Sequence, residues 1–157
     1  MKDQESDPEN TVKKSINREK IIAENVQHPN IVKYLDHFQE GMAYFFIMEL
    51  CEGSLEEIIS KRGFLSEEEA SNYFRQILEG YKILQEHSIL HRDLKPSNIL
   101  YNVGENNELN IKIADFGLSR FVLDPNKSQT LSIVGTHLYA APELFSSSKK
   151  YSSKADI

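Results

Sequence analysis

The segment His91–Asn98 constrains this chain more than any other part of its sequence. It reads His-Arg-Asp-Leu-Lys-Pro-Ser-Asn, so a carboxylate, an amine and an amide fall within six positions, with apolar residues on both sides. Two shorter motifs follow, Asp-Phe-Gly at 115–117 and Ala-Pro-Glu at 141–143. Each motif alone recurs by chance, but the three in this order form a specific signature.

Together these motifs resemble the catalytic set of protein kinases. The resemblance implies an α+β, bilobal protein-kinase-like fold that transfers the γ-phosphate of ATP, with Mg²⁺, to hydroxyl groups of a protein substrate. Lys95, two residues after Asp93, and Thr136, six residues before Pro142, favour serine and threonine over tyrosine as acceptors. The stretch 91–121 is similar both to calcium/calmodulin-dependent kinases and to autophagy-initiating kinases, so the subfamily stays open.

The resemblance implies a role for each polar residue of the motifs. Asp93 orients the attacking hydroxyl and accepts its proton, Lys95 reaches the transferred phosphate, and Thr136 contacts both side chains. Asn98 and Asp115 offer the oxygen ligands that Mg²⁺ prefers. These two ligands flank a predicted strand pair at its opposite ends, so that they can converge.

A nucleotide site is implied around the end of a predicted strand at 43–48. Met48 would guard the pocket, backbone groups of Glu49 and Cys51 would bond the adenine, and Leu100 would pack beneath it. Backbone contacts tolerate many side chains, so this match depends on position alone. Four further residues match the apolar column that links the two lobes of a kinase: His91, Phe116, Ala23 and Tyr34.

Two more residues are implied near the phosphates. Glu19 lies nine residues before His28-Pro29-Asn30, a spacing that in the family marks the helix glutamate paired with the ATP-anchoring lysine. Lys2, 17 positions before Glu19, is the candidate for that lysine, and the alternative for Glu19 is a solvated helix residue. The glycine-rich loop that covers the phosphates is absent, because the seven glycines lie far apart.

The resemblance covers only part of a kinase domain. We expect residues 1–157 to be a partial domain truncated at both ends, without the C-terminal helices of the large lobe. Within it, 1–48 would be a remnant of the small lobe, 49–53 the hinge and 54–157 the first part of the large lobe. Asp156 would hold the Asp93 loop through its backbone, and we expect the chain alone to have weak or no activity.

Regulation by phosphorylation is implied as well. Kinases with an arginine before the catalytic aspartate, here Arg92, usually become active when a phosphate on the activation segment pairs with that arginine. Ser132, three residues before Gly135, occupies the usual phosphosite, and Thr130 and Ser128 are the alternatives.

Composition limits the classes of partner and location. The chain has 157 residues and a formal net charge of −6, which disfavours nucleic acid and anionic membranes as partners. One cysteine excludes an internal disulfide and favours an intracellular, cytoplasmic location, with the nucleus left open. No apolar run approaches the roughly 20 residues of a membrane span. A non-catalytic kinase-like binding module is the alternative function; the missing loop favours it, and the intact motifs oppose it.

Periodicity and capping residues predict the secondary structure. A helix is expected from Pro8 to about Val26, then an antiparallel hairpin of 31–35 and 43–48 around Glu40-Gly41. A short helix should begin after Ser54, and strands at 99–101 and 109–113 should follow the Asp93 loop. The capping box at 66–69 predicts the best helix, whose apolar face we expect in the core: Ala70, Tyr73, Phe74, Ile77, Leu78, Tyr81 and Leu84. The first helix has a weaker apolar stripe: Val12, Ile16, Ile22 and Val26.

Overall fold

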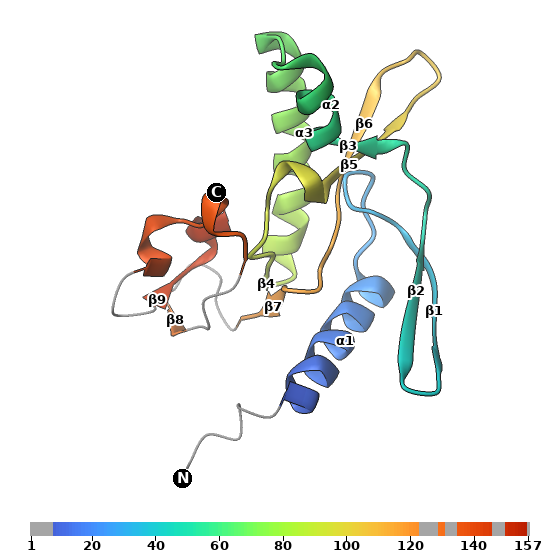
Figure 1. The fold of residues 1–157 in the computed structure, drawn as a ribbon, viewed down its shortest axis with the longest axis vertical. Coiled ribbons are helices and arrows are strands. Elements are labelled where there is room, and N and C mark those ends of the chain that lie inside the picture. Colours follow the sequence, from blue (N-terminus) through green and yellow to red (C-terminus); the bar gives the residue numbers. More distant parts are fainter. Residues whose placement is uncertain (1–7, 123–128, 131–134, 146–149, 157) are drawn as a thin grey trace.

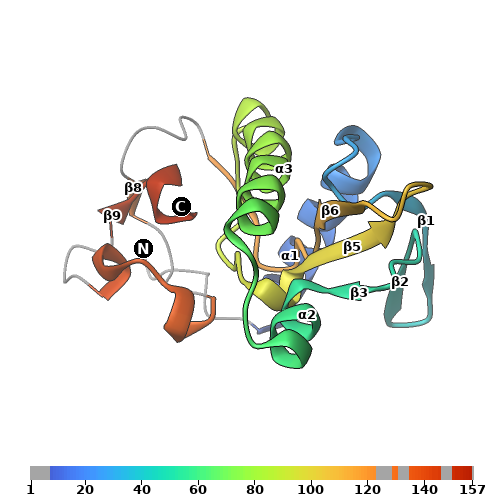
Figure 2. The same cartoon turned by 90° about the horizontal axis from the view of Figure 1, so that it is seen from above.

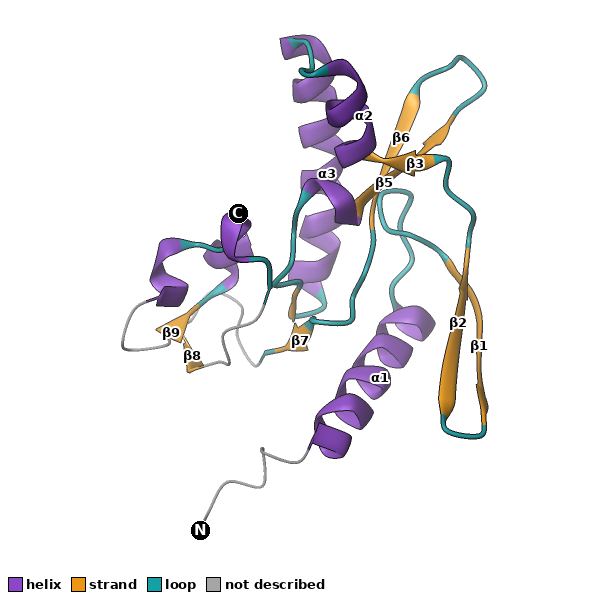
Figure 3. Ribbon diagram, viewed as in Figure 1, coloured by secondary structure: helices purple, strands orange, loops and turns teal. Residues whose placement is uncertain are grey.

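The computed structural model describes residues 8–122, 129–130, 135–145 and 150–156. Helices and short strands are mixed along the described chain, as the α+β prediction expects (Figure 3). The helices are α1 (Pro8–Asn25), α2 (Leu55–Arg62) and α3 (Glu67–Glu86), with short 3-10 turns at Pro96–Asn98, His137–Tyr139, Pro142–Phe145 and Ser153–Asp156. The strands are β1 (Tyr34–Glu40), β2 (Ala43–Met48), β3 (Gly53–Ser54), β4 (Ile89–Leu90), β5 (Ile99–Val103), β6 (Leu109–Ile113), β7 (Arg120–Phe121), β8 (Gln129–Thr130) and β9 (Lys150–Tyr151).

Helix α1 forms where the sequence predicts it, but among its described side chains only Ile22 is buried, and Val26 follows the last residue of the helix. Ile22 and Val26 are 1% and 6% exposed, whereas Val12 is 57% exposed. The predicted stripe is therefore wrong at Val12, because the first turns of α1 project away from the core while its last turns pack against it (Figure 1).

The predicted hairpin is present, with its first strand shifted along the chain. Strands β1 and β2 pair antiparallel with Glu40 opposite Ala43, and Gly41 in the connecting turn has φ +59°, which glycine adopts without strain. The first strand begins at Tyr34 because the residues before it bond elsewhere. Ile31 forms a parallel bridge with Ile113, and the Val32 amide donates to the Ile113 carbonyl at 2.9 Å.

Helices α2 and α3 begin at the caps that the sequence predicts. The Ser54 hydroxyl caps α2, and Ser66 and Glu69 form a complete capping box at the start of α3. Tyr73, Tyr81 and Leu84 of α3 are buried as expected. Three other residues of its predicted core face, Ala70, Phe74 and Leu78, are exposed.

The core lies where α3, the end of α1 and a small sheet meet. Strands β3, β5 and β6 form this sheet in the order β3-β5-β6, and β6 lies against α3. Both views place α3 between hairpin β1–β2 and the C-terminal segments (Figures 1 and 2). Fully buried apolar side chains of this core come from α1, α3, β4, β6 and the loops between elements: Ile22, Ile31, Val32, Leu84, Ile89, Ile111, Ile113 and Phe116.

Candidate active site

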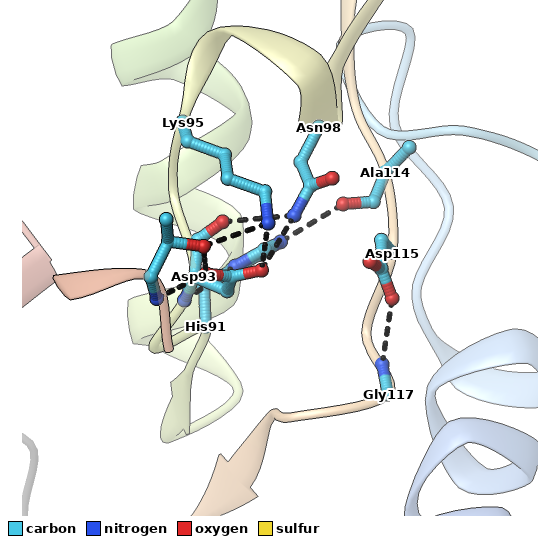
Figure 4. Close-up of polar contacts among 8 residues, drawn as sticks. His91, Asp93, Lys95, Asn98, Ala114, Asp115 and Gly117 are labelled. Carbon is cyan, nitrogen blue, oxygen red and sulfur yellow. Dashed lines mark hydrogen bonds and ion pairs between the residues drawn. The ribbon is translucent and has the colours of Figure 1, made fainter. Parts of the chain in front are cut away.

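Asp93 lies in the loop between β4 and the turn at Pro96–Asn98, and four hydrogen-bond donors surround its carboxylate (Figure 4). Thr136 donates to Oδ1 twice, from its amide at 2.9 Å and from its hydroxyl at 2.8 Å. On the other oxygen, Lys95 Nζ lies 2.7 Å from Oδ2 and Asn98 Nδ2 lies 3.0 Å from it. Lys95 Nζ also donates to the Thr136 hydroxyl at 2.8 Å. The three residues predicted to be catalytic therefore form one network.

These contacts set the protonation states of the pair. Burial alone would raise the pKa of the Asp93 carboxyl, but hydrogen bonds from Lys95 and Thr136 outweigh it, and the pKa is lowered. The hydrogen bond to Asp93 raises the pKa of Lys95. The site therefore holds a carboxylate and an ammonium at neutral pH. A carboxylate held this way positions a hydroxyl by accepting its hydrogen bond and is a weak base.

Asp156 and the His91 ring accept hydrogen bonds from backbone amides of the Asp93 loop and hold it in place. Asp156 accepts hydrogen bonds from the amides of His91 and Arg92, at 2.8 and 2.7 Å, which confirms the predicted anchor. The buried His91 ring contacts the Ala114 carbonyl through Nε2 at 3.0 Å and accepts the Asp93 amide on Nδ1 at 3.3 Å. Arg92, between them, has φ +69°, a conformation that needs this support.

Asn98 and Asp115 lie at the same end of the strand pair β5–β6, not at opposite ends as predicted, because the two strands are antiparallel. Asn98 precedes β5 and Asp115 follows β6, and the Ala114 amide donates to the Asn98 carbonyl at 2.9 Å. Asn98 Nδ2 donates to the Asp93 carbonyl at 2.9 Å as well as to Oδ2. The side-chain amide oxygen of Asn98 is therefore the atom suited to a cation. Asp115 is exposed, with φ +66° and one carboxylate oxygen on the Gly117 amide at 3.3 Å. Among the described residues, no group of three His, Cys, Asp or Glu could hold a metal by itself.

A column of rings connects the Asp93 loop with the hairpin. Phe116 is fully buried, with ring centroids 5.2 Å from His91 and 6.4 Å from Tyr34. The Tyr34 hydroxyl donates to Glu19 Oε1 at 3.0 Å. Burial raises the pKa of Glu19, the Tyr34 bond opposes this, and Asp115 adds to it. Glu19 is therefore partly buried, with the Tyr34 hydroxyl as its hydrogen-bond donor. Lys2, its predicted partner, lies outside the described residues.

Of the predicted nucleotide-binding residues, Met48, Glu49 and Cys51 lie along the connection between the hairpin and α2, and Leu100 lies in β5. Met48 ends β2 and is 42% exposed, while Cys51 and Leu100 are half-buried against the main core. The Glu49 carboxylate pairs with Lys112 at 2.9 Å and accepts the Lys33 amide at 2.7 Å. These side-chain contacts fix the backbone path of this connection.

Arg18 and Arg120 lie near enough to Arg92 for their positive charges to interact, and we call these three residues the arginine cluster; the sequence did not predict it. Burial lowers the pKa of Arg18 on α1, and the positive charges of Arg92 and Arg120 lower it further. Arg92 Nε donates to the Leu118 carbonyl at 2.8 Å. Of the predicted phosphosites, Thr130 lies in the short strand β8, and Ser132 and Ser128 lie outside the described residues. A basic residue in a short strand such as β7 carries no local signal, so the sequence alone could not predict the cluster.

No helix in the described part of the chain is long and apolar enough to span a membrane.

Comparison with known proteins shows the family of this chain. The family model for the protein kinase domain matches residues 1–157. Similar curated proteins include serine/threonine-protein kinase ATG1c of Arabidopsis thaliana, 33% identical over 93% of this chain and 20% of the relative. Another is DNA damage response protein kinase DUN1 of Saccharomyces cerevisiae, 36% identical over 92% of this chain and 32% of the relative. A third is a hormonally up-regulated neu tumor-associated kinase homolog of Xenopus tropicalis, 40% identical over 93% of this chain and 20% of the relative. The chain thus spans between a fifth and a third of these relatives. It belongs to the protein kinase family and contains a catalytic region of the serine/threonine type.

Proposed function

We propose that the protein containing this chain transfers the γ-phosphate of ATP to serine or threonine hydroxyls of a protein substrate. The observation that carries the proposal is the closed network of Asp93, Lys95 and Thr136 beside Asn98 and Asp115. Membership of the family implies ATP, a divalent metal and a protein substrate in general terms. We further propose Mg²⁺ as the metal and the cytoplasm or nucleus as the location, which the unpaired thiol of Cys51 supports.

The residues of this chain would position the reactants and balance their charge. Asp93 would accept a hydrogen bond from the substrate hydroxyl and hold its proton as the oxygen attacks. Lys95 would neutralise charge on the transferred phosphate, and the Thr136 hydroxyl would keep both side chains in register. Mg²⁺, when bound, supplies Lewis-acid neutralisation of the phosphates. Asn98 and Asp115 would each offer it an oxygen, and the other ligands would come from phosphate and water.

The nucleotide would lie against the connection that follows β2. In this proposal the backbone of Glu49 and Cys51 bonds the adenine, Met48 and Leu100 enclose it, and Glu19 orients a phosphate-binding lysine. Support comes from Glu19, which is partly buried and accepts a hydrogen bond from the Tyr34 hydroxyl. Lys2 remains our candidate for the lysine.

We also propose activation by a phosphate on Ser132 or, failing that, Thr130. The cluster of Arg18, Arg92 and Arg120 supports this, because about two negative charges would relieve the repulsion among three guanidinium groups. Ser132→Ala in the longer protein should abolish the activated state, and unchanged activity would contradict the assignment.

The test of the main proposal is phosphotransfer by the longer protein and by its Asp93→Asn variant. Asparagine keeps the shape of the side chain and removes its negative charge. We expect the rate to fall by about 100-fold or more. Equal incorporation of phosphate by both proteins would overturn the proposal in favour of a non-catalytic binding module.

A further inference from the structure

Ser15 on α1 contacts the segment that follows Asp115. Its half-buried hydroxyl donates a hydrogen bond to the carbonyl of Gly117. The next carbonyl along the chain, that of Leu118, accepts the hydrogen bond from Arg92 Nε. The serine hydroxyl and the Arg92 guanidinium therefore contact carbonyl groups of consecutive residues, so they border the same small region.

The other two arginines of the cluster are related to this region by position and by charge; Arg18 Nε itself donates to the Lys14 carbonyl at 3.0 Å. Arg18 follows Ser15 by three residues on α1, so the two side chains lie on one face of the helix. The charges of Arg92 and Arg120 both act on Arg18. Positive charges from α1, the Asp93 loop and β7 thus interact with one another in the part of the fold that holds Ser15.

We propose that Ser15 is a phosphorylation site whose phosphate is bound by Arg18, Arg92 and Arg120. A modifying protein kinase would form the Oγ–phosphorus bond as the γ-phosphate bond of ATP breaks; ADP leaves, and the hydroxyl proton passes to the base of that kinase. The phosphate carries about −1.5 to −2 charges at pH 7 and offers three acceptor oxygens to the guanidinium groups.

A phosphate at Ser15 would exclude a second phosphate from the cluster. Two phosphates would bring about −3 to −4 charges against three guanidinium groups, so they would repel each other there. Phosphoserine also has no hydroxyl proton for the Gly117 carbonyl, so α1 would lose its contact with the Asp115 segment. Phosphorylated Ser15 therefore opposes activation. This consequence rests on the proposed regulation through Ser132, whereas the contact between phosphate and arginines does not.

Residues 12–14 of α1 are exposed, so a modifying enzyme can approach Ser15 when its bond to Gly117 opens. Val12, one turn before Ser15, is 57% exposed, and the buried anchors Ile22 and Val26 lie at the other end of the helix. Opening the bond between Ser15 and Gly117 therefore leaves the buried end of the helix in place.

The test is a ³¹P NMR titration of the longer protein with phosphoserine encoded at position 15. The second pKa of a free phosphoserine is about 6, and nearby arginines should lower it by about one unit or more. Arg18→Gln and Arg120→Gln should each raise it back toward 6. Arg75→Gln, which removes an exposed arginine of α3 outside the cluster, should leave it lowered. A value near 6 that Arg18→Gln does not change would overturn the proposal.

A second measurement separates the contact from its consequence. The titration requires no phosphotransfer, so it gives its answer even if Asp93→Asn shows that the protein is not a kinase. In an active protein phosphorylated at Ser132, phosphoserine at position 15 should lower activity by roughly fivefold or more. Equal activity with and without it would overturn the competition, even with a lowered phosphate pKa.

Discussion

The Thr136 hydroxyl connects the two charged side chains on which the proposed chemistry depends. It donates to Asp93 and accepts from Lys95, each at 2.8 Å. Thr136→Val keeps the shape and removes both bonds, and a hydrogen bond to a charged group contributes about 1.5–3 kcal/mol. We expect phosphotransfer to fall about 10- to 100-fold. The pKa of Asp93 should rise toward its ordinary value, so the acid limb of the kcat/KM profile should move to higher pH. Thr136→Ser should recover most of the loss, and an unchanged pH profile in Thr136→Val would contradict the network.

His91 gives the fold a pH dependence of known sign. Burial lowers its pKa below 6.5, although the charges of Asp156, Asp115 and Asp93 oppose this. The unfolded chain therefore binds this proton more readily than the folded chain does. The contribution of His91 to the free energy of unfolding should be steady above about pH 6.5, fall as the pH drops from there toward the lowered value, and level off below it. Urea titrations between pH 5 and 8 measure it; His91→Phe should flatten the slope, and His137→Asn, at an exposed histidine, should keep it.

Single residues also show where sequence reasoning stops. Asp93, Lys95 and Asn98 could be assigned because three types of group recur at fixed spacing in one short segment. Arg18 and Arg120 could not, because they come from two elements that meet only in the folded chain. The role of Asp156 was predictable from resemblance, and its two backbone contacts confirm it.

At the scale of elements, α3 depends on one close approach. A Cβ at Gly80 would lie 2.5 Å from the Asn30 carbonyl oxygen, which belongs to the backbone and cannot yield easily. Alanine favours a helix by about 1 kcal/mol over glycine, but this clash should outweigh it and destabilise the protein by about 1–3 kcal/mol. Ser71→Ala, on an exposed position of the same helix, should change stability by less than about 0.5 kcal/mol. Chemical denaturation compares the two; a more stable Gly80→Ala protein would contradict the structure.

Elements were predictable where their signals are local, as at the caps of α2 and α3. The first strand was misplaced because its β-branched residues, Ile31 and Val32, bond to Ile113 of a distant strand. The same loop is held by the Asn30 side chain, which donates to the Ile111 carbonyl at 2.8 Å. The local sequence pattern indicates that residues 31 and 32 are extended, but it cannot show which strand they pair with.

At the scale of the whole molecule, an apolar groove stays open beside the Asp93 loop. It has a volume of about 250 Å³ and lies between α2, α3 and the turn at Pro96–Asn98. Phe74 and Leu78 line it and are 54% and 41% exposed. The helix period assigned these side chains to a core but could not show what would cover them. Exposed apolar surface of this kind promotes association.

The 157-residue chain expressed alone should therefore self-associate through this groove. Its sedimentation coefficient should rise with concentration, and the double variant Phe74→Gln and Leu78→Gln should reduce that rise, because burying each side chain contributes about 1.5–3 kcal/mol. Met42→Gln is the matched control: Met42 is 94% exposed on the hairpin turn and lies outside the groove. Equal effects of the two substitutions on sedimentation would mean that association follows total exposed apolar surface. Suppression by the groove variant alone would locate the contact on the face of α3 beside the catalytic loop.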